Sequence, residues 1–128
     1  MAETAAFESA LDARVAEVLE RCTKCGACVE ACPMPGPAGL DVGDPKAVAG
    51  GVIDLLRGGA GTPEAARWAA ICSGSGSCIP ACRDGVNPRF MLAMARLALL
   101  RRPTSAGASA APASCRCRAA CVCCRACS

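Results

Sequence analysis

The chain has 128 residues, among them thirteen cysteines, two phenylalanines, one tryptophan and no histidine, and its formal net charge is +3. A chain of this length fits one domain with a modest apolar core, so disulfides or bound metal are expected to replace part of the missing aromatic packing. Residues 1–102 hold eleven basic and eleven acidic side chains, and the excess lies in Arg116, Arg118 and Arg125. This balance argues against nucleic-acid binding by the first 102 residues.

Four stretches before residue 103 have the pattern of helices. In residues 4–21 the apolar positions recur at spacings of three and four, as an amphipathic helix requires: Phe7, Leu11, Val15, Val18 and Cys22. Further on, a capping residue is followed by proline three times, at 44–45, 62–63 and 87–88, which predicts helices over 45–57, 63–72 and 88–102. No run alternates as a strand does, so the sequence predicts an all-α fold.

The composition divides the chain into a helical domain, residues 1–102, and a tail, residues 103–128. The tail contains no acidic residue and only one branched apolar residue, so it cannot build a core and is expected to be disordered or the product of an out-of-frame reading. A small metal-binding module resembling metallothionein is the alternative, because the tail carries six cysteines: Cys115, Cys117, Cys121, Cys123, Cys124 and Cys127.

Neither a secretion signal nor a membrane span is predicted. The first fifteen residues include Glu3, Glu8 and Asp12 and lack an uninterrupted apolar stretch. The apolar run over 90–100 is too short to cross a bilayer and contains Arg96. We therefore expect a cytoplasmic protein, in which clustered cysteines are more typical of metal or redox sites than of disulfides.

The strongest motif is Cys22-x2-Cys25-x2-Cys28-x3-Cys32-Pro33. Three thiolates at this spacing bind three corners of one 4Fe-4S cluster, whereas the fourth cysteine ligates the other cluster of two-cluster ferredoxins. Structural zinc sites usually pair their cysteines two and two or add histidines, so zinc is the weaker alternative. The sequence between residues 22 and 39 is too rich in proline and glycine for long regular structure, and we expect a binding loop with short turns.

A second motif of equal length follows at an offset of fifty residues, with Cys72, Ser75, Cys78 and Cys82 standing where the first motif has its four cysteines. The crossed pattern of two-cluster ferredoxins then predicts two ligand sets. The first cluster takes four thiolates: Cys22, Cys25, Cys28 and Cys82. The second takes three: Cys32, Cys72 and Cys78. A 3Fe-4S cluster needs no fourth thiolate, whereas a 4Fe-4S cluster would need Ser75, water or another ligand.

These paired motifs in a helical setting resemble the α-helical dicluster ferredoxins. That family includes an iron-sulfur component of heterodisulfide reductase and the C-terminal half of the succinate dehydrogenase iron-sulfur subunit, and the resemblance covers about residues 7–102. The spacing Cys72-x5-Cys78-x3-Cys82 resembles the three-iron site of the latter. Arg83 departs from the family pattern, because proline usually follows this cysteine.

The resemblance implies a one-electron carrier or electron-transfer subunit serving a larger flavin or iron-sulfur oxidoreductase, with peripheral membrane association only through that partner. No catalytic acid or base is evident. Two alternatives stay open: a second cluster whose open iron acts catalytically, and a structural zinc module.

Overall fold

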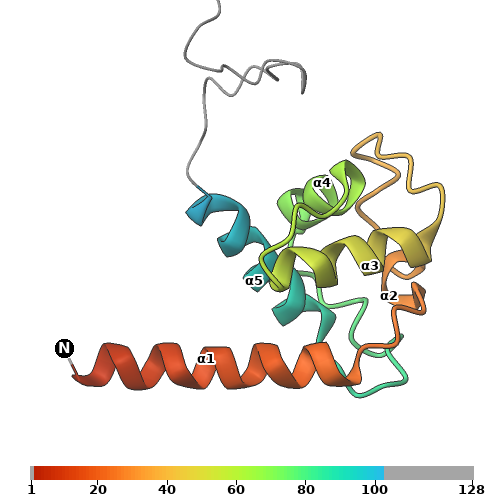
Figure 1. The fold of residues 1–128 in the computed structure, drawn as a ribbon. Coiled ribbons are helices and arrows are strands. Elements are labelled where there is room, and N and C mark those ends of the chain that lie inside the picture. Colours follow the sequence, from red (N-terminus) through yellow and green to blue (C-terminus); the bar gives the residue numbers. More distant parts are fainter. Residues whose placement is uncertain (1, 103–128) are drawn as a thin grey trace, which may run out of the picture.

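The computed structural model describes residues 2–102, which form five helices and no strand (Figure 1). These helices are α1 (Ala2–Arg21), α2 (Ala27–Glu30), α3 (Pro45–Leu56), α4 (Pro63–Ile71) and α5 (Pro88–Arg101). The all-α prediction is therefore confirmed. The predictions for the tail and its six cysteines lie outside the described residues.

Three helices begin where the capping residues predicted. The Asp44 side chain accepts a hydrogen bond from the Lys46 N–H at 3.0 Å, and the Thr62 and Asn87 side chains accept from the backbone N–H three residues later, both at 3.1 Å. Each cap satisfies one of the N–H groups that a helix start leaves free, which typically stabilises a helix by about 1 kcal/mol. Because each proline sits at the first helical position, it removes no helical hydrogen bond.

The core lies where α3, α4 and α5 pack against one another. Trp68 on α4 is fully buried there, beside Val52 and Ile53 of α3 and Met91 and Leu92 of α5. Cys28 and Cys78 belong to the same buried cluster, at 7% and 6% exposure. The two cysteine loops are therefore anchored in the core by one thiol each.

The first and second helices differ from the three core helices. The four-residue α2 interrupts the loop predicted over 22–39; it begins after Gly26 in the left-handed region and buries Cys28 and Val29. The first half of α1 extends beyond the rest of the domain (Figure 1), and all of residues 2–10 are exposed. No helix within the described residues is long and apolar enough to cross a membrane.

Candidate iron-sulfur site

Four of the seven predicted ligands line one cavity. Cys22, Cys25 and Cys28 come from the first loop, and Cys82 comes from the end of the second loop, more than fifty residues later. We call these four the first thiol group. The remaining wall is largely apolar: Ala49, Val86, Pro88 and Met91, with Lys24 and Asp84 at its edge. A cavity of this kind joins thiol donors from distant segments and keeps most other polar groups away from them.

The other three predicted ligands also lie near one another. Burial is the main cause that raises the pKa of Cys78, and Cys32 and Cys72 are close enough for their charges to raise it further. We call Cys32, Cys72 and Cys78 the second thiol group. The two groups are neighbours, because Cys78 also interacts electrostatically with Cys28 and Cys82. The seven thiols thus lie near one another, and their division into the two crossed ligand sets stays a prediction.

The two loops share their left-handed turns and two hydrogen bonds at the fifty-residue offset. Positive φ angles occur at Lys24 (59°) and Gly26 (80°) in the first loop and at Gly74 (76°) and Gly76 (78°) in the second. The hydrogen bonds repeat as well: residue 29 donates to 26 and residue 79 to 76, both at 3.0 Å, and residue 32 donates to 29 and residue 82 to 79, both at 3.2 Å. Left-handed residues turn successive N–H groups toward one concave side, an arrangement that binds anions and iron-sulfur clusters.

Three of the thiols, Cys22, Cys28 and Cys78, lie where ionisation is unfavourable without metal, so their pKa values are raised. Burial is the main cause that raises the pKa of Cys28 from 9.0 to about 12, and the charges of Cys22, Cys78 and Cys25 raise it further. Burial likewise raises the pKa of Cys22, although the backbone N–H of Lys24 partly lowers it by hydrogen bonding to the sulfur. Metal ligation requires thiolates, so a bound cation cluster would supply the compensating positive charge.

A clamp between the two loops was not predicted from the sequence. The hydroxyl of Thr23 donates to the Asp84 carboxylate at 2.6 Å, and the Thr23 backbone N–H donates to the same oxygen at 3.3 Å. These bonds hold the chain beside Cys22 against the chain beside Cys82. Sixty-one residues separate the partners, so no local pattern marks them; the only available signal is an acid two positions after a motif cysteine.

Ser75 occupies the position equivalent to Cys25, on the exposed side of the second loop. Its hydroxyl oxygen lies 3.3 Å from that of Ser77, and the described structure gives it no thiol or acid as a partner. The serine hydroxyl is also far harder to deprotonate than a thiol. The prediction that Ser75 is a metal ligand is not tested by this arrangement.

Two observations bear on whether these residues suit an iron-sulfur cluster. Within residues 2–102 no three Cys, Asp or Glu side chains converge on one point that would hold a single ion. The first thiol group instead surrounds a cavity, as a cube with one thiolate at each corner iron requires. The buried indole N–H of Trp68, one helical turn before Cys72, has no hydrogen-bond acceptor among the described atoms. A cluster sulfur near the second thiol group would be a suitable acceptor.

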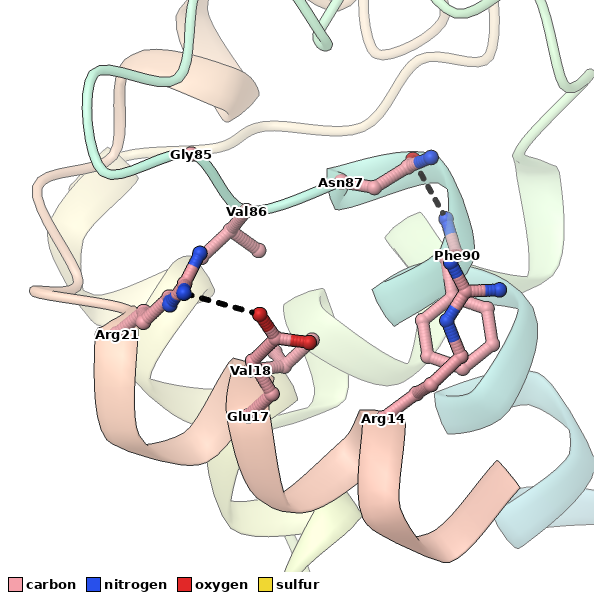
Figure 2. A pocket seen from close by; sticks show the side chains of 8 residues that line it. All are labelled: Arg14, Glu17, Val18, Arg21, Gly85, Val86, Asn87 and Phe90. Carbon is pink, nitrogen blue, oxygen red and sulfur yellow. Dashed lines mark hydrogen bonds and ion pairs between the residues drawn. The ribbon is translucent and has the colours of Figure 1, made fainter. Parts of the chain in front are cut away.

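A second cavity of about 250 Å³ lies beside the first thiol group, between α1 and the start of α5 (Figure 2). Arg14 and Arg21 flank it. The Arg14 guanidinium lies 5.6 Å from the centre of the Phe90 ring, and Arg21 pairs with Glu17 at 3.2 Å. Val86 lines both this cavity and the thiol cavity, so the two cavities are neighbours.

Comparison with known proteins identifies the first loop. The sequence model of the 4Fe-4S binding domain family matches residues 13–34, which include the end of α1 and the first four cysteines. The match supports an iron-sulfur protein of ferredoxin type, with a 4Fe-4S cluster and electron transfer as the general function. No curated protein and no solved structure matches the chain significantly.

Proposed function

We propose that this chain is a two-cluster electron-transfer protein. The first thiol group would hold a 4Fe-4S cluster, and the second thiol group would hold a 3Fe-4S cluster or a 4Fe-4S cluster with one iron not bound by cysteine. The observation that carries the proposal is that Cys82, from the second motif, lines the same cavity as Cys22, Cys25 and Cys28. This completes four thiolates for one cluster and leaves Cys32, Cys72 and Cys78 for a second cluster.

When bound, such clusters supply one-electron oxidation and reduction without proton transfer by the protein. The chain's own residues set the conditions. Val86, Pro88 and Met91 are buried and form an apolar wall beside the first thiol group, of which Cys25 is exposed to solvent. Backbone N–H groups, such as that of Lys24 toward Cys22, donate to the sulfurs and stabilise their negative charge. The proximity of Cys78 to both groups supports a short path for electrons between them.

The physiological partner we propose is a larger flavin or iron-sulfur oxidoreductase of the heterodisulfide reductase type. Electrons would be exchanged beside the cavity between α1 and α5, because Val86 lines both that cavity and the cavity of the first thiol group. The guanidiniums of Arg14 and Arg21 there suit a partner that presents carboxylates.

The decisive experiment is electron paramagnetic resonance of anaerobically purified protein, before and after dithionite, with Ser75→Cys and the neighbouring control Ser77→Cys. A three-iron signal in the oxidised protein that only Ser75→Cys abolishes would support the mixed pair. An oxidised protein without signal that gives two coupled four-iron signals on reduction would indicate an unidentified ligand at the second cluster. Absence of iron and sulfide would refute the proposal and favour zinc.

A second set of variants tests the crossing. Cys82→Ser should remove the first cluster although it changes the second motif, and Cys32→Ser should remove the second cluster although it changes the first motif. Iron content and the two resonance signals report the losses separately. If each variant instead removes the cluster of its own motif, the ligand sets are not crossed.

A further inference from the structure

The exposed half of α1 has the chemistry of a docking helix. Phe7 is 64% exposed, and all nine residues from 2 to 10 are exposed. Residues 2–13 contain three acidic side chains and no basic one: Glu3, Glu8 and Asp12. This segment therefore combines an uncovered aromatic ring with a uniformly negative charge.

The α5 helix carries the opposite, positive charge beside an apolar groove. A groove of about 580 Å³ runs between α5 and the end of α4, lined by Ala69, Leu92, Ala93, Leu97 and Leu100 and by Cys72, Ser73 and Gly74 of the second loop. Leu97 is 40% exposed and Leu100 is 74% exposed. Arg89 and Arg96 flank the groove, and α5 contains three arginines and no acidic residue.

In a single copy, both surfaces keep exposed apolar side chains and unpaired charges. Of the four large apolar side chains that the described residues expose, Phe7, Leu97 and Leu100 lie on these two surfaces. Among residues 2–102 the one ion pair joins Glu17 to Arg21, so neither the acids of residues 2–13 nor the arginines of α5 are paired. Exposed apolar groups flanked by complementary charge are typical of association surfaces.

We propose that a second copy of this chain fills the groove: each copy lays residues 2–13 of α1 along the α5 groove of the other. Exchange of identical segments between two copies gives a closed two-fold dimer. The lengths agree, because twelve helical residues span about 18 Å and the fourteen of α5 about 21 Å. The dimer would also cover residues 72–74, which shields the edge of the second thiol group; only this consequence depends on the proposed function.

Charge reversal tests the pairing with exposed residues that the core does not use. Glu8→Lys/Asp12→Lys makes both surfaces positive, and Arg89→Glu/Arg96→Glu, which changes the two arginines that flank the groove, makes both negative. Sedimentation velocity of the full chain, reduced and anaerobic, is expected to show a dimer for the natural sequence at about 100 μM and monomers for each variant alone. Mixing the two variants should restore a heterodimer, because both of its interfaces then join opposite charges. Phe7→Asp should raise the dimer dissociation constant at least about tenfold.

The proposal is overturned if the natural sequence sediments as a monomer at that concentration, or if the two reversed variants form no heterodimer when mixed. It is also overturned if Phe7→Asp dimerises as tightly as the natural sequence. Helix content by circular dichroism verifies that each variant is folded, and iron content reports on cluster binding separately. A dimer without iron would refute the proposed function alone, and an iron-loaded monomer would refute the dimer alone.

Discussion

The internal repeat supplies a matched pair of substitutions, Gly26→Ala and Gly76→Ala. Both glycines have nearly equal positive φ angles, 80° and 78°, so alanine adds a similar backbone strain of about 1–2 kcal/mol at each. The surroundings differ. A Cβ at Gly26 would lie 2.8 Å from the carbonyl carbon of Pro45, at the start of α3, whereas a Cβ at Gly76 would meet only the terminal carbon of Ile79 at 3.4 Å.

Backbone at the start of α3 cannot move aside as easily as an exposed isoleucine. Overpacking of this kind costs about 1–3 kcal/mol, so Gly26→Ala should be less stable than Gly76→Ala by about that amount. For a domain of this size, 1 kcal/mol corresponds to a Tm change of about 4–8 °C. Thermal unfolding of the cluster-loaded protein by circular dichroism measures the difference, with Gly36→Ala as a control because a Cβ there contacts nothing. Equal losses of Tm in the two variants would refute the reasoning.

Three further predictions concern the thiols and their surroundings. The folded-state pKa of Cys28 is raised from 9.0 to about 12, so above about pH 9 the unfolded chain releases the thiol proton while the folded chain retains it. The metal-free protein should therefore lose stability as pH rises above about 9. Urea unfolding across pH 7–10 measures the change in the free energy of unfolding, and a stability that rises with pH would contradict the prediction. Trp68→Phe should lower the reduction potential of the second cluster by about 40 mV, the equivalent of one hydrogen bond of about 1 kcal/mol. Redox titration measures the shift, and an unchanged potential means that the indole N–H does not reach the cluster. Arg14→Gln should slow reduction by anionic dithionite but not by a cationic viologen in stopped-flow experiments. The control is Arg57→Gln, at the exposed end of α3; an equal effect of this variant would show that only the net charge matters.

Local signals account for what the sequence predicts well. Asp44, Thr62 and Asn87 bind N–H groups two or three residues away, so each helix start is encoded within one turn. The predicted ends were also close: the helix expected to reach residue 72 ends at Ile71, and the one expected to reach 102 ends at Arg101. The short α2 was expected only as part of a loop, because its four residues show no helical periodicity and it forms against α3.

Contacts between distant segments could not be predicted from the sequence. The Thr23–Asp84 clamp and the position of Val86 in the wall of two cavities depend on how the second loop folds back onto α1. The exposure of Phe7 was likewise missed: the apolar spacing of residues 4–21 predicts one continuous buried face, whereas only Val18 of α1 is fully buried. Periodicity indicates which side of a helix is apolar but not how much of its length has a neighbour to pack against.

The repeat also limits the structural differences that can distinguish the two thiol groups. The left-handed residues and two hydrogen bonds recur at an offset of fifty residues, so the loops share the turns around Cys25 and Ser75, although only the first loop continues into a helix, α2. Ser75 therefore occupies a position whose backbone matches that of Cys25, so one atom, oxygen in place of sulfur, separates a complete set of thiols from an incomplete one. If Ser75→Cys leaves the second cluster unchanged, the backbone repeat does not extend to the metal. If it adds an iron, the serine alone determines the difference between the two clusters.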